Sequence, residues 1–514
     1  MPEFKVLIDT NVFIGLEDPG QIAPKFADLV RKCGEHGVRL FVHEDAIRDI
    51  DRDRDQSRRD ASLSRVRKFN LLSGIPKPDR CALEQQYGRI AKDNDEVDVA
   101  LLHAINIRAV DFLVTQDQGV HARVKVSPLS KQVLTVDDAL LWLRQTFEPT
   151  KVRLPLVDEC KAHEIDPSDE IFDSLRQGYP DFNVWWREKC VNQHRPCWIA
   201  SIEGELAGLV VRKDENRAEA TIRLPASKIL KVCTFKVKPK FRGEKLGELL
   251  LKQVLWFSQQ NGYDLTYLTT YPDQVVLIQV LEYFGFQHTL TLPNGEFVYE
   301  KPLSRQRLLA DEAADLFGAC RTSYPRFVAR PPASVFCVPI QNEYHQKLFP
   351  ELAIPSPLPL FGDEPDFIVP TRGSRIPGNT IRKVYLCRAQ TNAIRPGDCL
   401  LFYRSKSHGF LSSQAITSIG VAEAIAATSD HDELVRLTAK RSVFSEHELQ
   451  MMTRGDARPI KVIDFLLAGH IDPPVPLAEL IRLGVLKAGP QSILQVPPNR
   501  FAPLRDRIKL GFEL

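Results

Sequence analysis

The chain has little of what marks a secreted, a membrane-spanning or a strongly charged protein. Its formal net charge is only +2 over 514 residues, so no overall basicity indicates nucleic acid and any such signal must be local. No run of about 20 apolar residues occurs, and no signal-peptide core precedes the first predicted strand, so we expect no membrane association. The ten cysteines include no Cys-x-x-Cys pair. These absences predict a cytoplasmic protein with reduced thiols.

One short stretch invites a zinc interpretation. Cys190, His194 and Cys197 lie within eight residues of one another in the sequence. Their spacing matches no zinc knuckle, however, and a fourth ligand is missing. We therefore expect these side chains to be core and surface residues.

The composition is that of an ordinary globular protein, with 43% hydrophobic and 26% charged residues. A chain of this length predicts roughly three or four domains. Its patterns predict a multidomain α/β protein whose segments differ in character. They are a parallel sheet with flanking helices over 1–148, an α+β fold with a mixed sheet over 155–302, a helical linker over 303–333, and short strands typical of a small β-barrel over 334–514.

Acidic residues follow predicted secondary structure at several points of the first segment. An apolar strand ends at Asp9, another ends just before Asp117, and Glu44 follows a third. Asp98 lies early in the predicted helix that precedes the strand before Asp117. Apolar residues three, four and seven positions after Asp98 share its face of the helix. Because parallel strands present ligands at their carboxyl ends, these acids are expected to meet at one edge.

Most loop aspartates are helix caps or turn formers, and that interpretation would hold for any one of these acids alone. The set favours a metal site instead, because several elements aim carboxylates at one edge. Oxygen ligands of this kind bind Mg²⁺ or Mn²⁺, and a water on the metal can cleave a phosphodiester. Asp95 is a rival to Asp98, since both lie in the opening of one helix.

The first segment resembles the PIN domain, a metal-dependent ribonuclease fold found in many bacterial toxins. Leu7-Ile8-Asp9-Thr10-Asn11 is similar to the opening motif of that family, and Val114-Thr115-Gln116-Asp117 to its closing motif. The resemblance implies that Asp9, Glu44, Asp98 and Asp117 are catalytic and metal-binding, with Asn11 and Thr115 as polar supports. It also implies Mg²⁺ or Mn²⁺, RNA as substrate, and an antitoxin or other protein partner if the protein is a toxin. The charged run over 48–68 is either a solvated helix face or a phosphate contact.

The middle segment predicts a hairpin over 199–211, a strand over 231–237 that enters a helix at Gly243, and a further strand over 265–271. A second motif lies here, where the strand before Gly243 runs into a glycine-containing turn and then an amphipathic helix. Unpaired N–H groups at such a helix start, with the positive end of the helix dipole behind them, bind a pyrophosphate. Small residues let the phosphate approach the backbone. The residues of this turn are Val237, Arg242, Gly243, Glu244, Lys245, Leu246 and Gly247.

Residues 155–302 resemble the GNAT acyltransferase family, whose turn signature is Arg/Gln-x-x-Gly-x-Gly/Ala. Arg242, Gly243 and Gly247 fit it, whereas Lys245 stands where glycine is usual. The resemblance implies that the turn binds acetyl-CoA.

The usual catalytic tyrosine of the family falls at Leu281. Tyr283 cannot replace it, because two helical steps rotate a side chain by about 200°. The proton donor for the departing thiolate is therefore open, and a regulatory CoA-binding module is an alternative. Tyr267 and Tyr271 are expected to be core or rim residues.

The last segment resembles the PUA-like superfamily, which includes ASCH and EVE domains, on a Pro396-Gly397-Asp398 turn before a strand. The resemblance implies binding of RNA, including tRNA, or of a modified base. Phe402 and Tyr403 alternate, so at most one of them can face a base. Several basic residues lie near the predicted strands, either as scattered charge or as a nucleic-acid surface. They are Arg382, Lys383, Arg388, Arg404, Lys406 and His408.

Three functions are compatible with the sequence. The first, favoured by the acid set, is a metal-dependent ribonuclease with a GNAT module and an RNA-binding module. The second is an N-acetyltransferase acting on tRNA-linked amines or a protein, with a vestigial nuclease. The third is a non-enzymatic RNA-binding adaptor.

Overall fold

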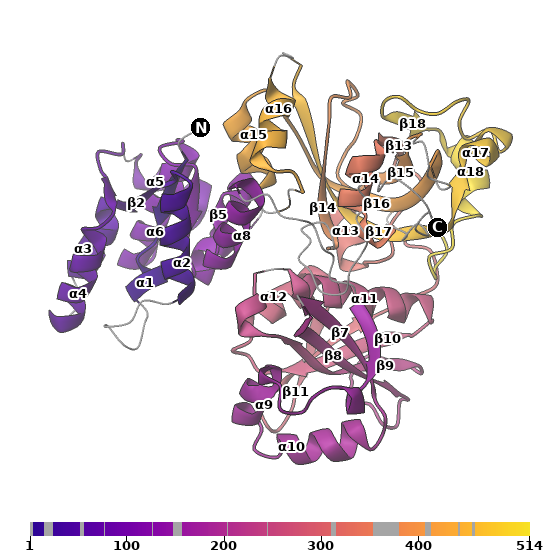
Figure 1. Cartoon of the computed structure of the whole chain (residues 1–514), viewed down its shortest axis with the longest axis horizontal. Coiled ribbons are helices and arrows are strands. Elements are labelled where there is room, and N and C mark those ends of the chain that lie inside the picture. The colour runs from indigo at the N-terminus through magenta and orange to yellow at the C-terminus, as the bar shows by residue number, and fades with distance from the viewer. Residues whose placement is uncertain are drawn as a thin grey trace, which may run out of the picture. The chain divides into compact units, whose positions relative to one another are not determined.

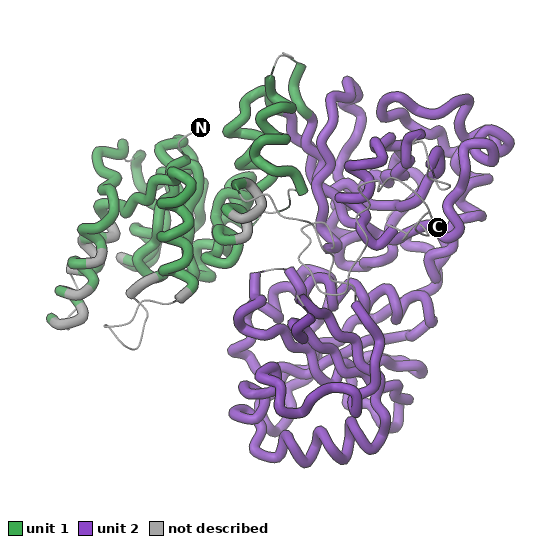
Figure 2. The backbone as a smooth tube through the Cα atoms, in the orientation of Figure 1, with its two compact units in different colours: residues 1–150, 428–460 green, residues 151–427, 461–514 purple. Residues whose placement is uncertain are grey.

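The protein forms two compact units in this computed structural model. Figure 2 shows them as residues 1–150 with 428–460, and residues 151–427 with 461–514. The structure describes residues 4–14, 24–51, 56–76, 78–125, 127–147, 157–202, 204–243, 245–309, 315–352, 380–406, 413–439, 441, 443–454 and 458–514. Glu244 and His408, which the predictions above include, lie outside these ranges, as does part of 48–68. In the ranges that are described, no helix is both long and apolar enough to cross a membrane.

The N-terminal part of unit 1, indigo to purple in Figure 1, contains the predicted parallel sheet. The strand order of this sheet is β3-β2-β1-β4-β5. The central strands β1 and β4 are almost wholly apolar and buried, as expected where helices cover both faces of a parallel sheet. The strands are β1 (Lys5–Ile8), β2 (Arg39–His43), β3 (Asn70–Leu72), β4 (Phe112–Val114) and β5 (Val133–Leu134).

Two helices of unit 1 come from far along the chain. They follow the long strand β16 (Ala415–Thr428), and the chain then returns as β17 (Ile460–Pro476). Arg436 of α15 contacts Asp111 with 2.6 Å between Nη1 and Oδ1, and α16 packs against α8. The helices of unit 1 are α1 (Asn11–Ile14), α2 (Pro24–Glu35), α3 (Glu44–Asp51), α4 (Gln56–Val66), α5 (Arg80–Tyr87), α6 (Asp93–Asn106), α7 (Gln118–Arg123), α8 (Val136–Phe147), α15 (His431–Thr438) and α16 (Glu446–Thr453).

The first sheet of unit 2 is mixed, with seven strands in the order β11-β12-β10-β9-β8-β7-β6. Every neighbouring pair is antiparallel except β9 and β10, which run parallel. The strands are β6 (Val157–Lys161), β7 (Pro196–Ile202), β8 (Glu205–Glu215), β9 (Ile229–Val237), β10 (Leu265–Thr270), β11 (Gln287–Thr291) and β12 (Phe297–Pro302). The predicted hairpin, the strand before the turn and the strand after it are thus all present.

Helices cover both faces of this sheet, because successive apolar side chains along its strands point to opposite faces and both faces must be buried. Trp198 packs into the core beneath α11, while its neighbour Cys197 packs on the other face against residues of α10 and the following helical turn. Cys190 is buried in that same second core, as expected. The helices of this part are α9 (Asp173–Gly178), α10 (Phe182–Trp185), α11 (Leu246–Gln260) and α12 (Val275–Tyr283).

The C-terminal sheet is open, and the predicted closed barrel is therefore not shown. Its order is β14-β17-β16-β15-β13-β18, with β14 and β18 at the edges. The free edge of β14 is covered by α11, because the backbone N–H of Arg382 donates to Oε1 of Glu248 at 2.7 Å. The remaining elements are β13 (Val335–Ile340), β14 (Arg382–Cys387), β15 (Cys399–Arg404), β18 (Leu494–Val496), α14 (Asn342–Leu348), α17 (Leu477–Arg482) and α18 (Pro498–Arg505).

The segment predicted as a helical linker, 303–333, is mostly not helical. Its described residues contain one short α-helix, α13 (Leu316–Thr322). Tyr324 and Phe327 are instead buried in two different cores of unit 2. Burial of these aromatic side chains makes the segment part of the packing rather than a spacer.

Candidate functional site

The carboxyl ends of β1 and β4 mark the place where the parallel sheet of unit 1 reverses its strand order. From β1 the chain adds β2 and β3 on one side and later β4 and β5 on the other. Such a switch point is where open α/β sheets bind ligands. Asp9 directly follows β1, and Thr115 and Asp117 follow β4. Two of the predicted acids therefore lie at the expected position.

A small hydrogen-bond network holds Asp9 in place. Thr115 Oγ1 donates to Oδ2 of the buried Asp9 at 2.7 Å, and Asn11 Nδ2 contacts Thr115 Oγ1 at 3.1 Å. The backbone N–H of Gln116 donates to Asn11 Oδ1 at 3.2 Å. Asn11 and Thr115 thus lie where the sequence prediction placed its polar supports.

The carboxylates of Asp9, Asp98 and Asp117 repel one another. Burial, and then the charges of Asp117 and Asp9, together raise the pKa of Asp98 to about 7. Burial also raises the pKa of Asp9, although its hydrogen bond from Thr115 opposes the shift, and Asp117 adds to it. Repulsion of this kind is what a cation or a positively charged ligand relieves.

The structure separates Asp98 from its rival. Asp95 accepts from the backbone N–H groups of Ala91 and Lys92 at 2.7 and 2.9 Å, and pairs with Arg123 at 2.7 Å. These backbone hydrogen bonds and Arg123 lower the pKa of Asp95. Asp95 therefore holds the start of α6, whereas Asp98 faces the other acids.

The predicted four-carboxylate metal site is not formed. Among the residues that the structure describes, no three His, Cys, Asp or Glu side chains are placed to hold one metal ion. Two of the acids have local partners instead: Asp117 Oδ1 accepts from the Gly119 N–H at 2.6 Å, and Glu44 Oε1 from the Gly74 N–H at 3.3 Å. The acids would have to move closer together before they could share one metal ion.

The second candidate site lies in unit 2, where β9 and β10 separate. Their parallel pairing ends at Val232 and Leu268, yet β9 continues to Val237. On its other side β9 stays paired with β8 up to that residue. Among the described residues, no strand pairs with the edge of β9 that faces β10 over 233–237, and the backbone groups of this edge can pair with an extended ligand.

The turn after β9 uses two residues in the left-handed region. Gly243 has φ of 91° and Lys245 has φ of 56°. A left-handed conformation costs a non-glycine residue roughly 1 kcal/mol, which explains why glycine is the favoured residue at position 245. The predicted helix start at Gly243 is wrong by three residues, since α11 begins at Leu246.

The first backbone N–H groups of α11 lie before the hydrogen-bonding pattern of the helix. Lys245 is the N-cap residue, and its side chain makes no capping hydrogen bond. A Cβ at Gly247 would meet only the Phe235 ring, at 3.9 Å, so packing within the protein does not require glycine there. The open space above Gly247 and the uncapped amides together fit a phosphate group.

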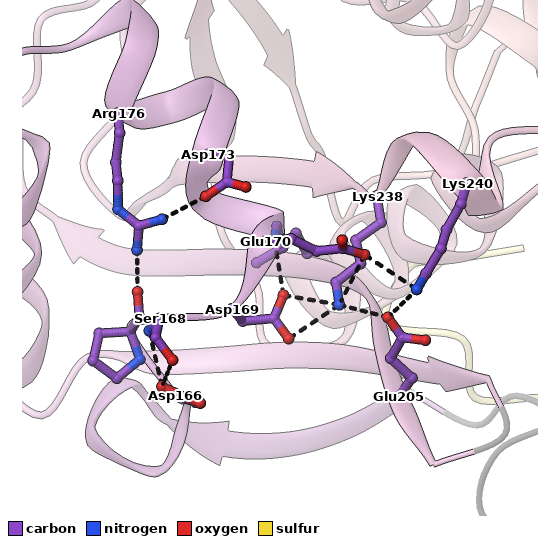
Figure 3. A network of polar contacts seen from close by, with 11 residues as sticks. Asp166, Ser168, Asp169, Glu170, Asp173, Arg176, Glu205, Lys238 and Lys240 are labelled. Atoms are coloured by element: carbon purple, nitrogen blue, oxygen red, sulfur yellow. Dashed lines mark hydrogen bonds and ion pairs between the residues drawn. The ribbon is translucent and has the colours of Figure 1, made fainter.

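The lysines around the turn differ in their electrostatic surroundings. Burial, and then the charge of Arg242, lower the pKa of Lys236, so an anion would be favoured beside these two cations. Lys238 and Lys240 are already neutralised (Figure 3). The buried Lys238 lies 2.9 Å from both Asp169 and Glu205, and Lys240 contacts Glu205 at 2.5 Å and Glu170 at 3.1 Å. This network fixes the segment before α9 to the end of β9.

The sequence of the part of unit 2 that contains the turn matches a known family. Residues 161–286 match the family described as Acetyltransferase (GNAT) family. This part of the chain is a GNAT acetyltransferase domain. No curated protein matches the sequence, and the predicted PIN resemblance of unit 1 gains no support from the comparisons.

Three solved structures that resemble parts of the chain are distant from it. ASCH from Zymomonas mobilis is 13% identical with a TM-score of 0.24, and covers 34% of this chain and 96% of its own. Arabidopsis thaliana NAA60 in complex with a bisubstrate analogue is 17% identical with a TM-score of 0.22, over 28% of this chain and 97% of its own. IAA acetyltransferase from Bacillus cereus is 14% identical with a TM-score of 0.23, over 29% and 100%. We base nothing further on likenesses this low.

The GNAT domain has no tyrosine at the usual catalytic position. Leu281 is completely buried in the core beneath α11. Tyr283 points elsewhere, since its hydroxyl donates to Glu423 of β16 at 3.0 Å. Neither side chain can protonate a thiolate at the turn.

Of the two tyrosines expected to be core or rim residues, Tyr267 lies in the core and Tyr271 at the rim. Tyr267 is a core residue, as expected, with its hydroxyl 2.5 Å from Glu215. Tyr271 is only half-buried and follows β10 directly, at the same edge as the turn. Its position just after a strand parallel to β9 was the signal that could have identified it.

Three of the basic residues of the C-terminal segment have partners within the protein. Arg382 pairs with Glu248, with 2.6 Å between Nη2 and Oε2. Lys383 is buried and donates to the Leu348 carbonyl at 2.7 Å, and the buried Arg404 donates to Asn342 at 2.6 Å. Phe402 and Tyr403 are both buried, so neither faces a base.

Proposed function

We propose that the chain is an acyltransferase that uses acetyl-CoA as donor and acts on an amine. The observation that carries the proposal is the separation of β9 from β10 directly before the uncapped start of α11. An extended chain with amide groups can pair with the free edge of β9, and a pyrophosphate can accept from the amides at the helix start. Acetyl-CoA has both groups in this order.

The turn residues divide the work of binding. Gly247 leaves room for the phosphates, and the backbone N–H groups at and after Lys245 face them. Lys236 and Arg242 supply positive charge, whereas Lys238 and Lys240 serve the network that holds the segment before α9. Bound there, acetyl-CoA would supply an activated acyl group, and the chain's own residues would orient the acceptor.

The test is calorimetric titration of the full chain with acetyl-CoA, followed by measurement of thiol release in the presence of primary amines. We expect saturable one-to-one binding, and thiol release that depends on the amine. A chain that binds no acetyl-CoA would overturn the proposal. Binding without release for any amine would support the alternative of a CoA-binding regulatory module.

A nuclease in unit 1 is the second candidate function. It is favoured by the mutual repulsion of Asp9, Asp98 and Asp117 at the switch point of the sheet. The test is calorimetric titration with Mn²⁺, together with incubation of total RNA with and without the ion. Binding and cleavage that are both lost in Asp98→Asn would support this function. An unchanged affinity for Mn²⁺ in that variant would remove the site from consideration.

A further inference from the structure

Several arginines of unit 2 lie together outside the residues that match the GNAT family. They come from three segments of the chain, of which one follows β12, one precedes β13 and one includes the end of α18. All three segments pack on the same apolar core, to which Leu308, Phe327 and Phe512 contribute. The rings of Phe327 and Phe512 lie 5.7 Å apart. We call the arginines on these segments the arginine cluster: Arg305, Arg307, Arg326, Arg330 and Arg505.

Hydrogen bonds fix the three segments against one another. Arg326 Nη1 donates to the carbonyl oxygen of Gln306 at 3.3 Å, and Gln306 lies between Arg305 and Arg307 in the sequence. The backbone N–H of Glu513 donates to the carbonyl oxygen of Arg305 at 2.8 Å. The arginines of the first two segments therefore lie beside the third.

Arg330 shows that the charges of the cluster act on one another. Its Nη2 donates to the main-chain oxygen of Leu514 at 2.7 Å, which places it at the third segment as well. Burial, and then the charges of Arg505 and Arg307, lower the pKa of Arg330. Cations that repel one another in this way are stabilised by an anion placed among them.

Little negative charge within the protein balances the cluster. In the described part of the chain, the cluster forms an ion pair with only one acid, Asp506, whose Oδ1 lies 3.7 Å from Nε of Arg505. Asp506 and Glu513 both oppose the effect of the arginines on the pKa of Arg330, and both are exposed. Five arginines outnumber these two acids, so the surface attracts anions.

The chemistry of the cluster fits phosphate groups along a chain. A guanidinium group presents a planar set of donors that matches two phosphate oxygens. Because the arginines come from three segments, their charges are spread over a surface, and several linked phosphates fit it better than one. Phe327 and Phe512 are buried, so these aromatic side chains of the segments offer no ring on which a base could stack. Such a surface contacts the backbone of a nucleic acid and does not read its sequence.

We propose that the arginine cluster binds the phosphodiester backbone of a single-stranded nucleic acid. A flexible strand can follow a surface built from three segments and can reach the half-buried Arg326 and Arg330, whereas the phosphates of a duplex lie on a rigid cylinder. The cluster contains none of the basic residues that the sequence analysis grouped near the C-terminal strands. It also shares no residue with the acetyl-CoA turn, so this inference is independent of the proposed acyl transfer.

The experiment is a titration of a fluorescently labelled oligouridylate with the full chain at several salt concentrations, followed by anisotropy. A length of about 20 nucleotides exceeds the site sizes of about 4 to 16 nucleotides that are common for single strands. Arg307→Gln removes one exposed charge of the cluster, and Arg307→Lys keeps the charge but removes the planar donors. Arg31→Gln on α2 is the control, because it changes the net charge equally at a residue that pairs with Asp28 and Glu35. Thermal unfolding of every variant confirms that it is folded.

We expect the wild-type chain to bind the strand, and the logarithm of the affinity to fall linearly with the logarithm of the salt concentration. The slope should be about 0.7 for each phosphate contacted. Arg307→Gln should reduce this slope by about 0.7 and weaken binding about threefold to tenfold at low salt. Arg307→Lys should keep the slope, and Arg31→Gln should keep both the slope and the affinity. Arg326→Gln is a second test, with the same expected loss of slope as Arg307→Gln.

Four outcomes would overturn the inference. They are no binding at low salt, unchanged binding in both Arg307→Gln and Arg326→Gln, an equal loss in Arg31→Gln, and tighter binding of a duplex or of a polyglutamate peptide than of the single strand. The last of these would assign the surface to a different partner. Each leaves acetyl-CoA binding untouched, and a chain that binds no acetyl-CoA would overturn the proposed function while the arginine cluster stands.

Discussion

The acidic edge of unit 1 and the turn of the GNAT domain both lie where parallel strands end, but they are built from different parts of the chain. At the acidic edge, side chains provide the chemistry: Asp9, Asp98 and Asp117 come from three places and repel one another. At the turn, the backbone provides it, through the free edge of β9 and the uncapped amides of α11.

A buried carboxylate in each region shows the consequence. Glu248 follows Gly247 directly and is as buried as Asp9, yet Arg382 and its hydrogen bonds lower its pKa. At Asp98 the charge of Arg123 does not outweigh burial and the acidic neighbours, which raise its pKa to about 7. The turn binds through backbone groups, so it tolerates lysine at position 245, where glycine is usual. The acidic edge acts through side chains, so it depends on every charge around it.

The largest expected effect concerns Glu248, the buried carboxylate that pairs with Arg382. Arg382→Met should destabilise unit 2 by about 3 to 5 kcal/mol, because it leaves the buried Glu248 charge unpaired. Chemical denaturation of the full chain measures this. Arg482→Met is the control, since its exposed pair with Glu479 should contribute less than about 1 kcal/mol. Equal effects of the two substitutions would contradict the difference drawn here.

The second effect tests the backbone-built site. Gly247→Glu should weaken acetyl-CoA binding by about a hundredfold, because a carboxylate would occupy the place of the phosphates. The fold should survive, since the nearest atom to a Cβ there lies at 3.9 Å. Calorimetry checks the affinity, with Gly34→Glu as control, where nothing lies within 4 Å. An unchanged affinity would place the phosphates elsewhere.

The third effect concerns Asp98 and is measured as the pH dependence of the stability of unit 1. The folded pKa of Asp98 is about 7, against 3.8 for an ordinary aspartate, so the folded state binds more protons between these values. The stability of unit 1 should therefore fall as pH rises from about 4 to about 7. Asp98→Asn should remove this dependence and stabilise the chain above pH 7 by about 2 kcal/mol.

Thermal unfolding across this pH range measures the change. Asp60→Asn, at an exposed position on α4, serves as the control and should keep the wild-type profile. A profile for Asp98→Asn that parallels the wild type would show that the acids do not interact as described.

The smallest effect concerns the left-handed residue of the turn. Lys245→Gly should stabilise the GNAT domain by up to about 1 kcal/mol, because glycine adopts a φ of 56° without strain. Acetyl-CoA affinity should stay within about threefold of wild type if the amides rather than the side chain bind phosphate. A tenfold loss in calorimetry would show that the Lys245 side chain takes part.

Local patterns of the sequence predicted much of this molecule. Apolar strands and helical spacing identified the parallel sheet, the β7–β8 hairpin and the strand before the turn. The helical phase of Asp98 placed it near Asp9 and Asp117. These features depend on residues close together in sequence, which is why they could be inferred.

What could not be predicted depends on contacts between distant residues. The C-terminal sheet has β14 and β18 at its edges, and Arg382 of β14 bonds to Glu248 of α11, which lies 134 positions away in the sequence. Lys383 and Arg404 were expected near a surface, but their partners come from the segment that includes α14. Glu44 was grouped with the other acids by its place after a strand, yet its side chain contacts Gly74.

Residues 428–460 belong to unit 1 but lie in the sequence between two segments of unit 2, which limits how the protein can be divided into fragments. The backbone passes between them three times, so no single proteolytic cut and no simple truncation releases unit 1 intact. A fragment ending near residue 150 would lack the α16 surface against which α8 packs. Removing all residues after 334 would delete residues 428–460 of unit 1 as well as the C-terminal sheet. An inactive fragment would therefore say nothing about the intact chain, and point substitutions are the tools of choice.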